Sequence, residues 1–412
     1  MTTPQPVRGT QSLLGEDADR LAAVTDAFDR VRRLFGFKRV EVPVMEQTQV
    51  FARSIGETTD VVSKEMYTFD DRSGDSVTLR PEFTAGICRA YLSEGWQQYA
   101  PLKVATHGPA FRYERPQKGR YRQFHQLDAE IIGAAEPQSD VELLSLGFQL
   151  LQELGIADGV TVELNTLGDA KSRDAWRSAL VDYFQSCRSD LSDDSVARLE
   201  RNPLRILDSK DPGDRAISAD APTVDEYLTP EASDFFAAVT AGLEAAGVPW
   251  TRNARLVRGL DYYRHTAFEF FTDRLGAQGT VLAGGRYDGL IESLGGPHTP
   301  AVGWAAGIER LAMMIDAPKR DTPRAVIVPL GARADSEAQR LLAQLRGAGI
   351  ATDMGYRGNM KKRLSRASES GATFAIILGD DELDRGEVQI KNLASGEQSL
   401  IPLSEIAAAV SP

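Results

Sequence analysis

The chain has 412 residues, which at about 150 residues per domain predicts two or three domains. Hydrophobic residues make up 42% and charged residues 26%, as in ordinary globular proteins, which excludes disordered, collagen-like and fibrous classes for most of the chain. The 47 basic and 59 acidic residues give a formal net charge of −12. Contact with nucleic acid therefore requires a local basic surface, because the field of the whole protein is repulsive.

Residue types exclude further classes. Two cysteines, Cys88 and Cys187, cannot form a disulfide framework, and none of the four histidines stands at metal-ligand spacing. No apolar run approaches the roughly 20 residues of a transmembrane helix, and the N-terminal segment has no apolar signal core. We therefore expect a cytoplasmic protein with no membrane partner and no metal bound by protein ligands.

The first part of the chain predicts one helix followed by several strands. Apolar residues recur at spacings of three and four over residues 16–36, which is typical of an amphipathic helix. Alternation predicts a strand at 39–44, a hairpin over 66–82, and two or three strands over 101–134. Because these strands follow one another without intervening helices, we expect an antiparallel sheet flanked by helices, the core of an α+β domain.

The remainder of the first domain, 1–320, mixes helices and strands. The expected elements are helices at 137–154 and 173–186, strands at 255–271 and 278–283, and helices at 286–294 and 303–316. A polar, helix-rich stretch from about 165 to 250 interrupts the strands, and we interpret it as an insertion.

A different pattern follows the charged segment 316–324, whose two prolines predict a linker. Two buried-strand runs alternate there with an amphipathic and a basic helix, at 325–331, 335–348, 361–371 and 373–379. This alternation predicts a small α/β domain over 325–412.

One segment concentrates positive charge. Residues 112–122 hold five basic side chains and one acid around a Pro-Gln-Lys-Gly turn, which predicts a strand, a basic loop and a second strand. Arginines are bidentate donors suited to a triphosphate, and alternation places the even-numbered residues of each arm on one face. Those residues are Arg112, Glu114, Arg120, Arg122, Phe124, Gln126 and Glu130. A solvated charged hairpin is the alternative, and the mixture with aromatic and carboxylate side chains favours a ligand site.

Other segments carry side chains that can serve a ligand or simply pack. Arg258 stands beside a glycine at the mouth of an apolar strand, and Arg310 follows a run of small residues that allows close packing under a site. Glu82 and Thr84 suit an ammonium group, although Thr84 can equally cap a helix. The pair Gly284 and Gly285 predicts either a turn or a close backbone approach.

Several nucleotide-binding and catalytic motifs are missing. The sequence has no G-x-x-x-x-G-K-[ST] phosphate loop, no G-x-G-x-x-G after a strand, and no G-x-S-x-G elbow. A nucleotide site in this chain would therefore use arginines on an antiparallel sheet.

Taken in order, these segments resemble the class II aminoacyl-tRNA synthetases, and the bacterial-type histidyl-tRNA synthetases in particular. FGFKRVEVPVMEQT is similar to class II motif 1, FRYERPQKGRYRQFHQ to motif 2, and AVGWAAGIERL to motif 3. RGLDYY and GGRYDGL are similar to two peptides that mark the histidine-specific enzymes, and LDSK at 207–210 also matches. The resemblance implies a class II catalytic domain, a C-terminal anticodon-binding α/β domain, and a homodimer formed through motif 1.

The resemblance also implies a two-step reaction. The carboxylate of L-histidine attacks the α-phosphate of ATP, and the histidyl-adenylate then reacts with the terminal adenosine of tRNA-His. Arg112 and Arg258 are the implied catalytic residues and bracket the α-phosphate. Arg120 and Arg122 would hold the distal phosphates together with Mg²⁺, and the adenine is assigned to Glu114, Phe124 and Arg310.

Histidine binding is implied for Glu82, Thr84, Arg112, Gln126, Glu130, Arg258, Tyr262, Tyr263 and Tyr287. Of these, Glu82, Thr84 and Gln126 would hold the α-amino group, and Glu130 and Tyr263 the imidazole nitrogens. Contacts with tRNA are implied for Arg115, Gln117, Arg357, Lys361, Lys362, Arg363 and Arg366.

One alternative from the same superfamily is a catalytically inactive regulatory subunit of ATP phosphoribosyltransferase. Such chains typically lack the C-terminal domain, so residues 325–412 and the intact Arg112, Arg258 and Arg310 argue against it. A histidine- or tRNA-sensing module without catalysis is a third possibility.

Overall fold

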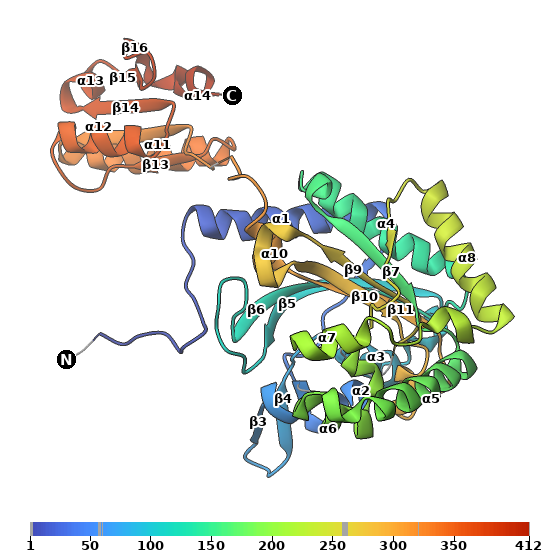
Figure 1. Cartoon of the computed structure of the whole chain (residues 1–412). Helices are drawn as coiled ribbons and strands as arrows, with labels where there is room; N and C mark the ends of the chain where they lie inside the picture. Colours follow the sequence, from blue (N-terminus) through green and yellow to red (C-terminus); the bar gives the residue numbers. More distant parts are fainter. Residues whose placement is uncertain (1–2, 57–58, 60, 258–262, 320, 412) are drawn as a thin grey trace. The chain divides into compact units, whose positions relative to one another are not determined.

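The computed structural model describes residues 3–56, 59, 61–257, 263–319 and 321–411 (Figure 1). The chain divides into two compact units, Met1–Pro318 and Lys319–Pro412. None of the described helices is both long and apolar enough to cross a membrane.

The larger unit is built on an eight-stranded sheet with the order β1-β5-β6-β11-β10-β9-β7-β8. Its strands are β1 (Lys38–Arg39), β5 (Leu102–Phe111), β6 (Gln123–Ile132), β7 (Thr161–Thr166), β8 (Thr251–Arg252), β9 (Arg264–Phe271), β10 (Thr280–Arg286) and β11 (Ala301–Gly307). The expected antiparallel sheet is confirmed for the central strands, which in sheet order are β5, β6, β11, β10, β9 and β7. The outermost pairs β1–β5 and β7–β8 run parallel.

Helices cover both faces of this sheet. One face carries α1 (Glu16–Leu34), α4 (Pro137–Glu153) and α8 (Pro230–Ala245), which bury a core around Phe28, Leu146 and Trp304 (Figure 1). The other face packs α3 (Thr84–Ser93) and α5 (Ala170–Ser186), with Ile87 and Trp176 in its core. Burying large apolar side chains on both faces fixes the central strands, on which the candidate site lies.

Smaller elements complete the unit. A three-stranded sheet has the order β2-β4-β3, with β2 (Met45–Gln47), β3 (Tyr67–Asp70) and β4 (Ser76–Leu79). The hairpin expected over 66–82 is confirmed by β3 and β4. The remaining helices are α2 (Thr48–Ile55), α6 (Asp193–Arg201), α7 (Pro212–Ser218), α9 (Leu290–Ser293) and α10 (Ile308–Ala312).

Some expected boundaries were wrong, and the largest error concerns the helix expected at 303–316. Residues 301–307 form β11, and the helix α10 begins only at Ile308. Besides Trp304, the small residues Gly303, Ala305 and Gly307 line the ligand cavity. Their small side chains have low strand propensity, so only pairing with β6 and β10 on either side specifies the strand.

Other corrections concern length. The strand expected at 39–44 is reduced to β1, the strand expected at 255–271 is described only from Arg264, and the helix expected at 286–294 covers only α9. Residues 101–134 form two strands, β5 and β6. Gly284 and Gly285 lie inside β10 and form no turn; a Cβ on Gly284 would come within 2.1 Å of the Gly303 carbonyl oxygen.

The LDSK segment belongs to a buried polar node among the helices α6 and α7. The Asp214 carboxylate accepts hydrogen bonds from Ser192 N and Oγ, Ser195 Oγ and Ser209 Oγ at 2.6 to 2.9 Å. Burial opposes ionisation, but these donors lower the pKa of Asp214 to about 2. Ser209 of LDSK therefore holds this region together from within.

The smaller unit has a five-stranded sheet with the order β13-β12-β14-β15-β16. Its elements are β12 (Ala325–Leu330), α11 (Ala332–Gly347), β13 (Thr352–Met354), α12 (Met360–Glu369), β14 (Phe374–Gly379), α13 (Asp380–Asp384), β15 (Glu387–Asn392), β16 (Gln398–Pro402) and α14 (Ile406–Val410). The parallel pairs β12–β13 and β12–β14 pack with α11 around a core that includes Ile327, Leu341 and Ile376, as expected for an α/β pattern.

Candidate active site

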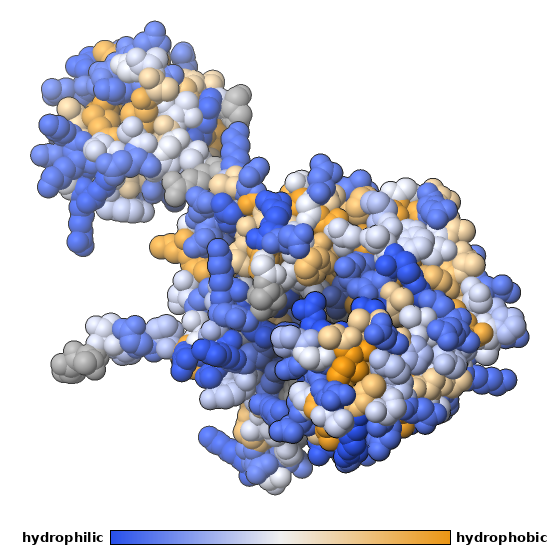
Figure 2. All heavy atoms as spheres, in the orientation of Figure 1, coloured by the Kyte–Doolittle hydropathy of each residue, from blue (hydrophilic) through white to orange (hydrophobic). Residues whose placement is uncertain are grey.

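A cavity of about 310 Å³ opens over the central strands β6, β10 and β11. The larger unit is hollowed on the face seen in Figure 2, and hydrophilic residues gather at the rim of the hollow. Side chains predicted for substrate binding come together in the cavity wall from five separate segments of the chain. They are Glu82, Thr84, Arg112, Glu114, Arg120, Phe124, Gln126, Tyr263, Tyr287 and Arg310.

Glu82, Thr84 and Tyr287 line one end of the cavity, and the predicted Glu130 bonds to two of them without being part of the cavity wall itself. Glu130 of β6 is fully buried; Thr84 Oγ1 donates to its Oε1 at 2.6 Å, and the Tyr287 hydroxyl donates to its Oε2. Gly303 of β11 pairs with Glu130 of β6, and a Cβ on Gly303 would lie 1.4 Å from Glu130 Oε2. Glycine is therefore required at 303, because any side chain would take the space of the carboxylate.

Burial dominates the electrostatics of this end. It raises the pKa of Glu130 to about 8, although the hydrogen bonds from Thr84 and Tyr287 act in the opposite direction. Burial also raises the pKa of Glu82, against the hydrogen bond that Ala85 N donates to Glu82 Oε1 at 3.0 Å. A poorly hydrated acidic pocket of this kind favours a ligand that brings N–H donors or a positive charge.

Thr84 does not cap α3 with its side chain, so the capping alternative is wrong. The helix begins at Thr84 with Phe83 in the cap position, and Thr84 Oγ1 donates to Glu130 instead. The buried carboxylate of Glu82 is the acceptor for the helix N–H of Ala85. The start of α3 is thus tied to the floor of the cavity.

The other end of the cavity is lined by arginines. Arg112 lies over the Phe124 ring with 5.4 Å between Cζ and the ring centroid, and its Nε donates to the Pro81 carbonyl at 3.0 Å. Arg120 forms an ion pair with Glu114. Arg310 donates to the carbonyl oxygens of Gly119 at 3.2 Å and Thr280 at 2.7 Å.

Carbonyl oxygens hold the guanidinium groups of Arg112 and Arg310 in place, and the ion pair with Glu114 holds that of Arg120. Burial and the positive charge of Arg120 lower the pKa of Arg310, because three cations share one half-buried wall. Arginine keeps its charge under such a shift, and although Glu114 and Glu269 offset part of the repulsion, an anionic ligand would relieve more of it. A polyphosphate meets this requirement with bidentate oxygens.

Some predicted residues lie elsewhere. Arg122 is not part of the cavity wall: it stacks on Tyr113 with 3.8 Å between Cζ and the ring centroid, and its Nε donates to the Glu114 carbonyl at 3.2 Å. Arg258 and Tyr262 lie outside the described residues.

The residues assigned to tRNA lie on two surfaces, one in each unit. Arg115 and Gln117 are exposed in the loop after β5, where Gln117 and Arg120 exchange backbone hydrogen bonds. Of the residues assigned to tRNA in the second unit, Arg357, Lys361, Lys362 and Arg366 are exposed. Arg363 differs from these because it is half-buried and donates to the Pro329 carbonyl.

Sequence reasoning missed several residues of the site. Glu309 and Glu269 line the cavity, and the Glu269 carboxylate accepts from Thr280 Oγ1 at 2.9 Å. Arg80 is buried behind the wall and donates to the carbonyl oxygens of Val42 and Pro109, both at 2.8 Å. Glu309 stands next to Arg310 in sequence, which is a signal that could have identified it; a buried arginine such as Arg80 gives no comparable signal.

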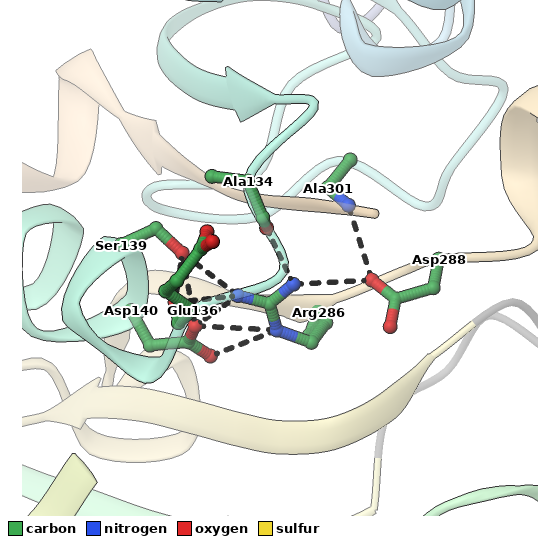
Figure 3. A network of polar contacts seen from close by, with 7 residues as sticks. All are labelled: Ala134, Glu136, Ser139, Asp140, Arg286, Asp288 and Ala301. Atoms are coloured by element: carbon green, nitrogen blue, oxygen red, sulfur yellow. Dashed lines mark hydrogen bonds and ion pairs between the residues drawn. The ribbon is translucent and has the colours of Figure 1, made fainter. Parts of the chain in front are cut away.

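GGRYDGL contributes a buried polar network centred on Arg286, the residue before Tyr287 in the sequence (Figure 3). The Arg286 guanidinium pairs with Asp140 and donates to Ser139 Oγ at 2.8 Å and to Asp288 Oδ1 at 3.2 Å. Asp288 Oδ1 in turn accepts from Ala301 N at 3.0 Å. The network joins β10, β11 and the start of α4, and so fixes the strand end that carries Tyr287.

Comparisons with known proteins follow the same division of the chain. Residues 9–311 match the family profile described as Histidyl-tRNA synthetase, and residues 324–411 match the profile described as Anticodon binding domain. A protein named Histidine--tRNA ligase from Novosphingobium aromaticivorans is 63% identical over 91% of each chain. A second with this name, from Gluconacetobacter diazotrophicus, is 56% identical over 98% of each chain.

Solved structures agree with these sequence matches. Apo histidyl-tRNA synthetase of S. aureus superimposes with a TM-score of 0.83 at 33% identity, covering 99% of this chain and 100% of the other. A Bacillus halodurans protein described as an ATP phosphoribosyltransferase regulatory subunit/histidyl-tRNA synthetase shares the fold at 21% identity and a TM-score of 0.66.

Proposed function

The chain belongs to the histidyl-tRNA synthetase family, and we propose that the cavity binds histidine at its acidic end and ATP at its arginine end. The protein is a histidine--tRNA ligase, and the regulatory-subunit alternative is not favoured. The observation that supports the proposed site is that Thr84 and Tyr287, the two hydrogen-bond partners of the buried Glu130, line the same cavity as Arg112, Arg120 and Arg310.

At the acidic end, Glu130 accepts the N–H of the imidazole, and Tyr263 holds the other ring nitrogen. Glu82, Thr84 and Gln126 bind the α-amino group of histidine. Gln126 is 8% exposed and its Oε1 has no hydrogen-bond acceptor role inside the protein, which suits an incoming N–H donor. Amino acids without an imidazole leave these buried groups unpaired, which can give about 10⁴-fold rejection.

At the arginine end, the adenine lies between Phe124 and Arg310, and the phosphates face Arg112 and Arg120. Negative charge grows on the α-phosphate oxygens as the histidine carboxylate attacks and pyrophosphate leaves. Fixed cations that meet this charge lower the barrier without having to reorganise. Arg112 therefore acts on the reacting phosphate, with Arg258 assigned beside it by the family resemblance.

Magnesium enters this account with ATP. No three His, Cys, Asp or Glu side chains gather as a metal site within the described part of the chain. Mg²⁺ usually binds substrate phosphates and only one or two carboxylates, and Glu269 in the cavity wall fits that donor set. Bound there, the ion would neutralise charge on the distal phosphates.

Transfer to tRNA-His completes the proposal. Arg115 and Gln117 of the exposed loop serve the acceptor end, and the exposed basic residues of the second unit serve the anticodon region. The helical stretch from about 165 to 250 is proposed as a family-specific insertion, and the enzyme as a cytoplasmic homodimer.

The test is ATP–pyrophosphate exchange by the purified full chain with each of the twenty amino acids in turn. We expect exchange with histidine and none above background with the others. A matched Arg112→Lys variant keeps the charge but loses the fork of donors, and should exchange more slowly. Exchange with no amino acid would overturn the proposed site.

A further inference from the structure

The junction between β11 and α10 lies between the two sides of the proposed adenine slot. Phe124 projects from β6 and Arg310 from α10, and both line the cavity. In the sheet, Gly307 is the last residue of β11 and pairs with Gln126 of β6. The chain then leaves the sheet and begins α10 at Ile308.

The end of β11 would leave the next backbone donor of β6 without a strand partner. That donor is the N–H of His125, and Glu309 accepts from it with both carboxylate oxygens, each 3.0 Å from the nitrogen. His125 Nδ1 also lies 2.8 Å from Glu309 Oε1. A side-chain carboxylate from α10 thus replaces the backbone carbonyl that a longer β11 would supply.

Both ends of this contact adjoin the proposed slot. His125 lies between Phe124 and Gln126, and Glu309 immediately precedes Arg310. Glu309 is only 6% exposed, so its carboxylate oxygens need hydrogen-bond donors from within the protein, and His125 supplies them. No step of the proposed reaction uses Glu309, although it lines the cavity.

We propose that Glu309 is a positioning residue that clamps α10 to β6 through His125 and so sets the spacing between Phe124 and Arg310. The inference rests on the proposed assignment of these two side chains to the adenine. A slot that opens by a fraction of an ångström loses stacking contact on one ring face, because dispersion falls off steeply with distance. Loss of the clamp should therefore weaken ATP binding and leave histidine binding almost unchanged.

The test uses the full chain in the exchange assay, with histidine and ATP varied separately. Glu309→Gln should raise the KM for ATP about 10-fold and change the KM for histidine by less than about 2-fold, since stacking of one base is worth about 1–3 kcal/mol. Glu153→Gln is the matched control; its carboxylate accepts from Arg30 Nε at 2.6 Å outside the cavity and should leave both constants unchanged.

Substitutions at His125 test the clamp from the other side and protect against a folding defect at Glu309. His125→Ala keeps the backbone donor, so the KM for ATP should rise less than in Glu309→Gln. His125→Asn restores a side-chain donor and should recover part of that loss. A purely structural role would instead change both Michaelis constants together, or neither, and would overturn the inference.

A double-mutant cycle separates this inference from the proposed site. Phe124→Ala should raise the KM for ATP. Adding Glu309→Gln to that variant should raise the KM for ATP by a much smaller factor than Glu309→Gln does in the wild type, because the slot is already lost. If Phe124→Ala acts on ATP and Glu309→Gln does not, the clamp is refuted and the slot stands. If neither Phe124→Ala nor Arg310→Ala acts on ATP, the slot assignment falls and the clamp with it.

Discussion

The two ends of the cavity bind their ligands by different physical means. The histidine end is made of buried groups such as Glu130 and Tyr287, at 0% and 1% exposure, that already bond to each other. The ATP end is a half-buried wall in which Arg112, Arg120 and Arg310 are anchored by carbonyl oxygens or an ion pair. Buried hydrogen bonds select a ligand by its donor pattern, whereas a cationic wall stabilises charge and depends less on the exact ligand shape.

The largest effect is expected at the histidine end. Glu130→Ala should lower kcat/KM for histidine about 10³-fold, mainly through KM, because the imidazole N–H and the Tyr287 hydroxyl both lose a buried acceptor. The KM for ATP should change little. Exchange kinetics with histidine as the varied substrate measures this.

Glu163→Gln provides the control for that change. This carboxylate lies on β7 of the same sheet, accepts from Asn253 Nδ2 at 2.6 Å and is not part of the cavity wall. Its variant should bind histidine normally. Normal histidine saturation in a folded Glu130→Ala protein would remove Glu130 from the pocket.

At the ATP end, Arg258→Ala should slow adenylation about 10²-fold, because one fixed cation is lost where charge develops on the α-phosphate. The expectation rests on the family resemblance, since Arg258 lies outside the described residues. Single-turnover adenylate formation separates this loss of rate from a loss of binding. An unchanged rate in a folded variant would show that the described arginines suffice.

The second unit should affect neither end of the cavity. Replacing both Lys361 and Lys362 by alanine should leave exchange unchanged and raise the KM for tRNA-His about 5-fold, more at low salt, because two phosphate contacts are lost. Arg333→Ala with Arg340→Ala removes two exposed charges from α11 of the same unit and serves as the control. Equal effects of the two pairs would mean that general charge, rather than the α12 surface, binds tRNA.

The smallest effect concerns pH and stability. Glu130 has a pKa of about 8 in the folded protein against 4.5 for an ordinary glutamate, so the folded state holds an extra proton between these values. The free energy of unfolding should therefore fall as pH rises from 5 to 8. Glu130→Gln removes this titration. Between pH 5 and pH 8 the melting temperature of the variant should therefore fall by about 2–4 °C less than that of the wild type. If the melting temperatures of the two proteins changed with pH in the same way, the extra proton of the folded state would not be on Glu130.

Much of the fold could be predicted from local pattern. Apolar periodicity identified α1, α4 and the alternating elements of the smaller unit, because each of these buries one regular face. The strand β11 could not be predicted in this way. Its glycines and alanines match no period, and they form a strand because β6 and β10 pair with them and Glu130 needs the space above Gly303.

The site was predictable where chemistry follows sequence motifs and not where it depends on contacts between distant segments. The arginines around the loop at 112–122, and Glu82 with Thr84, were identified from their spacing and from the resemblance. The bonds from Glu130 to Tyr287, 157 residues apart, and from Arg286 to Asp140, 146 residues apart, follow from the arrangement of strands in the sheet. Arg122 had the expected spacing, yet stacking on Tyr113 takes its side chain away from the cavity wall.

The most direct test of the divided cavity measures two Michaelis constants in two variants, Glu130→Gln and Phe124→Ala, by pyrophosphate exchange. The account predicts a crossed result: Glu130→Gln raises the KM for histidine and spares ATP, and Phe124→Ala raises the KM for ATP and spares histidine. If each variant instead raises both constants by the same factor, the two ends do not act separately and the account is contradicted.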